Sequence, residues 1–197
     1  MKKSADLKQV ILSTARRKFL TYGFHHVSID SIVRDLHTSK STIYKYYSTK
    51  EDLIKGVLDQ LNHEINDQLE VIINDEDTSF PHKLGLVIEF TRNTLARINE
   101  EFLQDLKFRT PEIWDYYEES RKFRIEKYYR QLFIHGIEQG IVRKDIDIQI
   151  LLEIYLHLTD MSVNADQFNK VQYSNQDLYS EISKVFLEGA LIRENES

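Results

Sequence analysis

The sequence predicts an all-α protein. Only two prolines and six glycines occur among its 197 residues, so few positions would interrupt a helix. Apolar residues recur mainly at intervals of three and four, and the strict alternation typical of strands is scarce. Segments with this periodicity indicate about nine helices in all.

The first helix is expected to end just before Gly23. One apolar stripe follows it, formed by Leu7, Ile11, Ala15 and Phe19. A glycine directly after a helix can adopt the left-handed conformation that closes many helices. Gly23 is therefore expected to end this helix with a positive φ.

Two short helices and a tight turn are expected next. Ser28 can cap a helix that runs to about Leu36, and Ser39 can cap another that runs to about Tyr47. Their inward positions are apolar, namely Ile29, Ile32, Val33, Leu36, Ile43 and Tyr47. Such short helices bury little alone, so these side chains should converge on the first and fourth helices.

A long fourth helix is expected from Ser48, where Ser48 and Glu51 fit the S-x-x-E capping box and Lys50 faces outward. The predicted later helices cover residues 49–74, 80–98, 100–108, 112–139, 146–163 and 175–193. Gly136 and Gly140 are expected to close the longest of these. The predicted domains are residues 1–50 and 51–197.

Charge differs in sign between the two parts of the chain. Residues 1–55 hold 11 Lys and Arg against 5 Asp and Glu, a balance of +6, whereas residues 56–197 hold 15 against 27, a balance of −12. A basic module on an acidic body is expected where one module docks on phosphates. An ordinary solvated basic face is the alternative.

The sequence lacks the residues and motifs that several other classes of function require. With no cysteine, disulfides, thiol nucleophiles and Cys-ligated zinc are excluded. No histidine pair has HExxH-like spacing, and neither a GxSxG motif nor a phosphate-binding glycine loop is present. We therefore expect no enzyme and no cofactor or metal. No signal peptide and no long apolar run occurs, so a soluble, cytoplasmic protein is expected.

The third helix presents the chemistry of a DNA-reading helix. Its outward residues are small, hydroxylic, aromatic or basic and include no carboxylate. Such side chains let a helix approach the major groove and donate to bases and phosphates. The candidate DNA-binding residues are Ser28, Ser39, Lys40, Ser41, Thr42, Tyr44, Lys45, Tyr46 and, as a flanking phosphate contact, Lys50. Any one of these residues could equally belong to an ordinary solvated helix face. Together, in a helix-turn-helix, they favour DNA binding.

This segment resembles the TetR family of helix-turn-helix regulators. The resemblance lies in Ile32-Val33, in the run from Ser39 to Tyr47, and in Lys50-Glu51-Asp52-Leu53, with Phe19, Gly23 and Phe24 at the end of the first helix. Leu36 and His37 depart from the family's usual Ala and Gly, and His37 would have to be left-handed. Ser41 replaces a common glycine, which puts the operator sequence in doubt.

The resemblance implies a homodimer that binds a palindromic operator and is released by a small-molecule ligand in the C-terminal domain. Residues that would line the ligand site are Phe90, Phe102, Trp114, Tyr117, Arg121, Tyr128 and Tyr155. Plain core packing is the simpler interpretation of most of these aromatics. A buried Arg121 needs a partner, and a protein carboxylate is favoured over an anionic ligand.

Two apolar stripes near the end of the chain are expected to pair subunits. The candidate interface residues are Leu151, Tyr155, Leu158, Ile182, Val185, Phe186 and Gly189. Two such helix pairs can form a four-helix bundle, and the resulting dimer would meet two DNA half-sites. A monomeric core is the alternative for these stripes. The alternative function is a DNA-associated protein of this fold without ligand gating.

Overall fold

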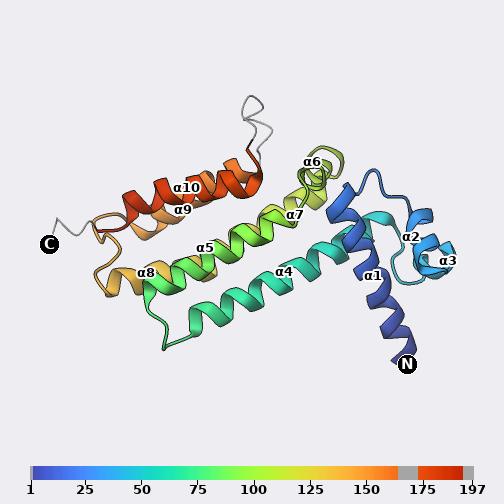
Figure 1. Cartoon of the computed structure of the whole chain (residues 1–197), viewed down its shortest axis with the longest axis horizontal. Coiled ribbons are helices and arrows are strands. Elements are labelled where there is room, and N and C mark those ends of the chain that lie inside the picture. The colour runs from blue at the N-terminus through green and yellow to red at the C-terminus, as the bar shows by residue number, and fades with distance from the viewer. Residues whose placement is uncertain (1, 164–172, 193–197) are drawn as a thin grey trace. The chain divides into compact units, whose positions relative to one another are not determined.

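The computed structural model describes residues 2–163 and 173–192, and these residues are almost entirely helical (Figure 1). They form two compact units. The N-terminal unit comprises Met1–Ile65 and Arg97–Glu118, and the C-terminal unit comprises Asn66–Ala96 and Glu119–Ser197. The units thus differ from the predicted division at residue 50, because a later segment of the chain returns to the first helices.

The N-terminal unit contains the helix-turn-helix and two later segments. Its helices are α1 (Lys2–Tyr22), α2 (Ile29–Leu36), α3 (Lys40–Tyr44), the first part of α4 (Lys50–Asn74), α6 (Glu100–Arg109) and the first part of α7 (Pro111–Arg124). The predicted stripe of α1 is buried at Ile11, Ala15 and Phe19, whereas Leu7 is only half-buried. Gly23 has φ +71°, which confirms the left-handed end of the first helix.

The start of α4 lies one residue later than predicted. The amide of Asp52 donates to Thr49 Oγ1 at 2.9 Å, and the amide of Thr49 donates to Asp52 Oδ2 at 3.1 Å. The capping box is therefore made by Thr49 and Asp52, and the prediction of Ser48 and Glu51 is wrong. Both pairs have a hydroxyl and an acid three residues apart, so the spacing alone does not distinguish them.

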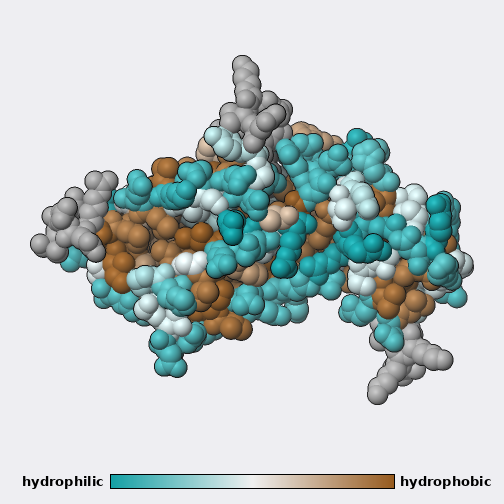
Figure 2. All heavy atoms as spheres, in the orientation of Figure 1, coloured by the Kyte–Doolittle hydropathy of each residue, from teal (hydrophilic) through white to brown (hydrophobic). Residues whose placement is uncertain are grey.

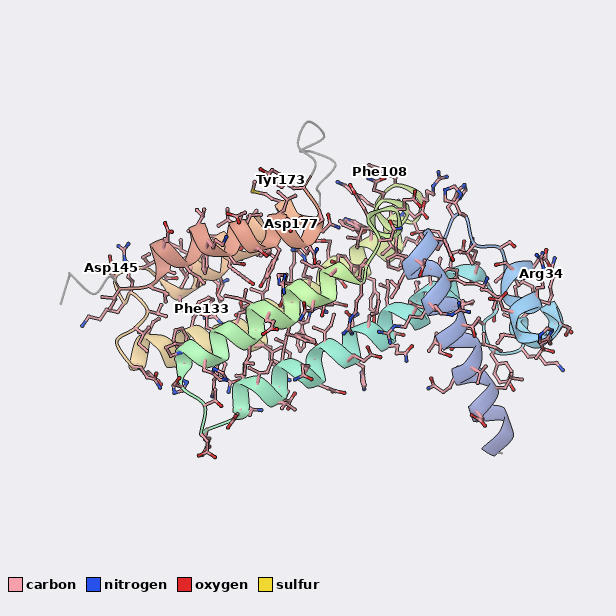
Figure 3. All side chains as sticks on the ribbon, viewed as in Figure 1. Arg34, Phe108, Phe133, Asp145, Tyr173 and Asp177 are labelled. Carbon is pink, nitrogen blue, oxygen red and sulfur yellow. The ribbon has the colours of Figure 1, made fainter. Side chains whose placement is uncertain are left out.

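The C-terminal unit is built around aromatic side chains. Its remaining elements are α5 (Phe80–Ala96), the π-helical turn η1 (Ile125–Tyr129), α8 (Arg130–Glu138), α9 (Ile148–Val163) and α10 (Asn175–Ala190). Phe133, labelled in Figure 3, lies with its ring centroid 6.3 Å from that of Tyr155 and 5.7 Å from that of Phe186. The predicted helix over 112–139 is present as the continuous succession α7, η1 and α8.

The two glycines near the end of α8 have different roles. Gly140 has φ +69° and follows the helix, as predicted. Gly136 lies inside α8, where an added Cβ would be only 2.6 Å from the Phe80 ring. The prediction that Gly136 closes the helix is therefore wrong, because this glycine permits a close approach of Phe80.

Membrane-spanning helices and metal-binding clusters are both absent from the part of the chain that the structure describes. No helix there is long and apolar enough to cross a lipid bilayer. No group of three or more His, Asp or Glu side chains gathers there in a way that could hold a metal ion.

Candidate nucleic-acid interface

Local hydrogen bonds set the positions of α2 and α3. The Ser28 hydroxyl oxygen accepts from the amide of Ser31 at 3.1 Å, and the Ser39 hydroxyl oxygen accepts from the amide of Thr42 at 3.2 Å. Between the helices His37 has φ 49° and ψ 43°. Both predicted caps and the left-handed histidine are confirmed, so a non-glycine residue makes this turn.

Aliphatic side chains hold the two short helices on the unit. Ile32 and Ile43 are completely buried, and Ile29 and Tyr47 are nearly so. Helix α2 contacts both α1 and α3. This packing fixes which face of α3 remains outward, because an α-helix with one buried stripe exposes the opposite side.

The outward face of α3 is the predicted one. Lys40, Ser41, Tyr44 and Lys45 are exposed, and Thr42 and Tyr46 are half-buried. The α-helix ends at Tyr44, earlier than predicted. The helical course nevertheless continues through Lys45, because the amide of Tyr47 donates to the Ile43 carbonyl oxygen at 3.0 Å.

Hydroxyl groups cluster at the N-terminus of α3. Ser39 Oγ lies 2.8 Å from both Ser41 Oγ and Thr42 Oγ1. Ser28 and Ser39 thus act first as helix caps, and Ser41 is the exposed member of the cluster. The free amides and the hydroxyls at this helix end together offer donors to an anion or a base edge.

The carboxylates near the outward face of α3 form ion pairs with lysines. Lys40 Nζ lies 2.9 Å from Asp30 Oδ1, and this hydrogen bond raises the pKa of the lysine. Asp35 pairs with Lys18 at 2.9 Å, chiefly through a hydrogen bond that lowers the pKa of its carboxyl group. Both acids are therefore at least partly neutralised within the unit, which leaves the surface favourable to phosphate.

Arg34 is a candidate that the sequence analysis missed. It is exposed on α2 (Figure 3), and neither Arg34 nor Lys45 forms an ion pair with any of the described residues. Arg34 lies away from the buried side of α2, which is marked by Ile29 and Ile32. Applying the outward-face analysis to α2 as well as to α3 would have identified it.

Lys50 is less exposed than predicted. It is half-buried, and its Nζ lies over the Phe24 ring at 5.6 Å from the centroid. Burial lowers the pKa of this lysine, while Glu51 and Asp105 oppose that shift. The prediction that Lys50 faces outward is thus only partly met, because the side chain is half-buried with its ammonium group over an aromatic ring.

Residues 11–57 match the family model described as bacterial regulatory proteins, tetR family. This part of the chain is a TetR-family helix-turn-helix segment. The match spans α2 and α3 and ends inside α4, so it coincides with the surface described above. The family that this segment matches is described as one of bacterial regulatory proteins.

Relatives of the whole chain and of its first part support this assignment. The DNA-binding transcriptional repressor TetR of Mycobacteroides abscessus is 36% identical over 59 residues, which are 30% of this chain and 31% of that protein. The fatty acid metabolism regulator protein of Bacillus subtilis is 22% identical over 195 residues, covering 96% of this chain and 98% of that protein.

The fold is also shared with solved structures. A putative transcriptional regulator from Saccharomonospora viridis, solved in complex with choline, has a TM-score of 0.77 at 19% identity. The similarity covers 96% of this chain and 100% of that one. At such identity the likeness concerns the fold of the chain alone.

The predicted ligand-binding residues do not gather in one unit. Phe102, Trp114 and Tyr117 belong to the N-terminal unit, whereas Phe90, Arg121, Tyr128 and Tyr155 belong to the C-terminal unit. Phe102 is buried, with its ring centroid 6.4 Å from that of Phe24. Phe102 thus packs in the core of the N-terminal unit, and its role in a ligand site stays a prediction.

The π-helical turn explains the position of Tyr128. The amide of Arg130 donates to the carbonyl oxygen of Ile125, five residues earlier, which shifts the register of the following helix. Tyr128 OH lies 3.1 Å from Glu70 Oε2 and 3.0 Å from Lys127 Nζ.

Arg121 has a protein partner. Its guanidinium group pairs with Asp160 and also donates to Thr159 Oγ1 at 3.3 Å. The side chain is largely buried, so the ion pair compensates part of the cost of removing its charge from water. The favoured alternative, a protein carboxylate, is the one present in the structure.

Three predicted dimer residues lie inside the chain's own core. Leu151, Tyr155 and Phe186 are buried in the C-terminal unit, so their assignment to an interface is wrong. Tyr155 contacts Phe186 with ring centroids 5.1 Å apart. These side chains are therefore unavailable to a second chain without rearrangement of the core.

Other apolar side chains on the same helices face outward. Val185 is 69% exposed, and Ile150 and Ile154, which the sequence analysis did not select, are 56% and 45% exposed. Leu158 and Ile182 are half-buried, and Gly189 is exposed. Figure 2 shows apolar surface on the C-terminal unit, which contains α8, α9 and α10.

Proposed function

We propose that this chain is a TetR-family repressor that binds a two-fold symmetric DNA operator as a homodimer and is released by a small molecule bound in the C-terminal unit. The observation that carries the DNA-binding part is the capped α3 with its outward hydroxyls, tyrosines and lysines. This face has the composition that major-groove reading requires, and its neighbouring acids are already paired.

Different side chains would serve different parts of the DNA. Ser41, Thr42 and Lys45 would contact base edges, because they are short or lie on the outward side of α3. Tyr44, Tyr46 and Arg34 would contact sugar and phosphate. Lys40 would exchange Asp30 for a phosphate, and Lys50 would reach a flanking phosphate from its position over the Phe24 ring.

The dimer would form through α9 and α10. Ile150, Ile154 and Val185 expose large apolar surfaces, and such surfaces gathered on neighbouring helices mark association sites. Two α9–α10 pairs related by a two-fold axis would form a four-helix bundle. That symmetry would present two copies of α3 to two operator half-sites.

The effector is the least constrained part of the proposal. One similar structure contains choline, and one relative is named as a regulator of fatty acid metabolism. These names point to unlike chemistries, so we transfer neither of them to this chain. A second candidate function, DNA binding without a ligand, is favoured by the packing of Tyr155 against Tyr129, Phe133 and Phe186.

The test is selection of bound fragments from random-sequence duplex DNA by the purified chain. We expect an inverted repeat to be enriched, with an affinity that falls steeply as salt rises, because phosphate contacts release counterions. Lys45→Ala and Ser41→Ala should change the preferred sequence, and Arg34→Ala should weaken binding to all sequences. Lys184→Ala, an exposed lysine of the C-terminal unit, is the matched control. Absence of any enriched sequence would refute the proposal.

Ligand gating needs a separate measurement. Small-molecule libraries should contain compounds that raise the melting temperature of the chain and also lower its affinity for the selected duplex. Such linkage requires a ligand that prefers the unbound conformation. Stabilising compounds that leave duplex affinity unchanged would favour the ungated alternative.

A further inference from the structure

We propose that Asp105 on α6 is a positioning residue for the DNA-reading helix α3, acting through the turn between α1 and α2. This inference rests on the DNA surface proposed above. Asp105 lies well outside residues 11–57, the segment that matches the family model. A helix that is distant in sequence would thus control the geometry of the helix-turn-helix.

The Asp105 carboxylate is bound directly to the turn. Its Oδ2 accepts a hydrogen bond from the backbone amide of His25 at 2.8 Å, and its Oδ1 lies 3.1 Å from Arg109 Nε. Asp105 is only 8% exposed. A buried carboxylate with both oxygens engaged makes strong, directional hydrogen bonds, so it holds His25 at a defined position.

Gly23 lets α6 approach this turn. A Cβ added at Gly23 would lie 2.9 Å from Asp105 Oδ2 and 3.3 Å from Glu101 Cβ. No ordinary side chain fits between the turn and α6 at these distances. The left-handed φ of Gly23 and its lack of a side chain thus serve the same contact.

Hydrogen bonds of Asn99 link the end of α1 to the start of α6. Its backbone amide donates to the Leu20 carbonyl oxygen at 3.1 Å, and its Nδ2 donates to the Thr21 carbonyl oxygen at 2.8 Å. Its Oδ1 accepts from the Glu101 amide at 2.8 Å and so caps α6. One residue therefore provides hydrogen-bond partners for backbone carbonyl groups in the last turn of α1 and for a backbone amide in the first turn of α6.

These contacts fix the direction in which the chain enters α2. The segment from Leu20 to His25 is held by α6, and Ile29 begins α2 four residues later. Helix α3 follows α2 through the short turn at His37. A change at Asp105 would alter the orientation of α2 and α3 together, while their internal caps remain intact.

The test compares Asp105→Ala with Asp105→Asn and Arg109→Met. The probe is the duplex that the wild-type chain selects from random sequence, with a mixed-sequence duplex as reference. We expect Asp105→Ala to lower affinity for the selected duplex by about tenfold or more, from loss of a buried charged hydrogen bond. Asp105→Asn retains an acceptor for the His25 amide and should recover most of the affinity. Arg109→Met should resemble the wild type.

The salt dependence separates positioning from simple destabilisation. Binding is measured where circular dichroism shows the variants to be fully folded. A misplaced α3 loses phosphate contacts and lowers the slope of affinity against salt, whereas partial unfolding lowers affinity equally at every salt concentration. Affinity within twofold of wild type for Asp105→Ala, or a loss with unchanged slope, overturns this inference alone. A wild-type chain that selects no duplex overturns the proposed function as well.

Two glycines supply a matched comparison. Gly23 and Gly140 have φ values of +71° and +69°, but a Cβ on Gly140 would meet nothing within 4 Å. Gly140→Ala therefore introduces the same backbone strain without the contact to α6. We expect Gly23→Ala to reduce duplex affinity by about tenfold or more and Gly140→Ala to leave it unchanged. Equal affinities for the two variants would contradict the role of the α6 contact.

Discussion

The helix pairs α2–α3 and α9–α10 distribute their apolar side chains in different ways. In α2–α3 the isoleucines Ile29, Ile32 and Ile43 are buried and Leu36 is half-buried, and the outward face of α3 is polar. In α9–α10 the apolar residues occupy two faces, with Leu151 buried and Ile150 exposed beside it. The first pair is complete within one chain, whereas the second leaves apolar surface that a second chain can cover.

The largest expected effect tests that contrast directly. Ile154→Glu combined with Val185→Glu should raise the dimer dissociation constant at least about a hundredfold, because two carboxylates would lose hydration in an apolar interface. Both side chains are exposed in the single chain, so the fold should persist. Sedimentation velocity measures the change. Leu86→Glu, at an exposed apolar position on α5, should leave the assembly intact.

Alkaline pH should destabilise the fold through the two buried tyrosines of α9 and α10, Tyr155 and Tyr179. Burial raises the pKa of both Tyr155 and Tyr179, whose hydroxyls lie 3.0 Å apart. A raised pKa in the folded state gives stability that is present below the unfolded pKa, near 10, and is lost as the pH rises above it. Each tyrosine should contribute a loss of about 1.4 kcal/mol per pH unit.

Urea unfolding between pH 9 and pH 12 measures this loss. Tyr179→Phe should remove one titrating group and make the decline less steep, at a cost near neutral pH of about 1 kcal/mol for the missing hydrogen bond. Identical pH profiles for wild type and Tyr179→Phe would contradict the conclusion that burial raises the pKa of Tyr179.

A smaller effect is expected in the turn between α2 and α3. His37→Gly should raise the free energy of unfolding by about 0.5–1 kcal/mol, because glycine removes the left-handed strain. The selected operator sequence should not change. Thr38→Gly is the matched control: His37 is the sole non-glycine residue with positive φ among those described, so Thr38→Gly should be destabilising. Loss of duplex affinity in His37→Gly would show that the imidazole itself contacts DNA.

The smallest effect concerns two helical glycines. A Cβ on Gly85 or Gly189 meets nothing within 4 Å in the single chain. Alanine at Gly85 should therefore stabilise α5 by about 0.5–1 kcal/mol and leave association unchanged. Alanine at Gly189 should weaken the dimer if α10 approaches its partner closely there. Equal stabilisation without weaker association would place Gly189 outside the interface.

The sequence predicted interactions between residues close in the chain. The caps by Ser28 and Ser39 and the left-handed conformations of Gly23 and His37 each depend on a few neighbouring residues. Their geometry follows from backbone rules that hold in any protein. Most of the α2–α3 surface was therefore predictable, except where Arg34 and the half-buried Lys50 were judged from one helix alone.

Contacts between distant segments were not predictable in this way. Phe102 packs beside Phe24, a residue far earlier in the chain. The spacing of residues in the sequence does not predict this contact. On α9, the neighbouring stripes marked by Ile150 and Leu151 are both apolar. Periodicity identifies each stripe but does not tell which one faces the chain's own core. The location of a ligand site likewise depends on how distant segments pack, so the sequence does not predict it.

The π-helical turn η1 bears on how relatives of this chain can differ in length. Its backbone bond from Arg130 to Ile125 spans one residue more than an α-helical bond. A homologue lacking one residue in this turn could keep an unbroken helix with the same neighbours before and after it. Alignments that place gaps only in loops would then displace every α8 residue by one position, turning its side chains by about 100° around the helix axis.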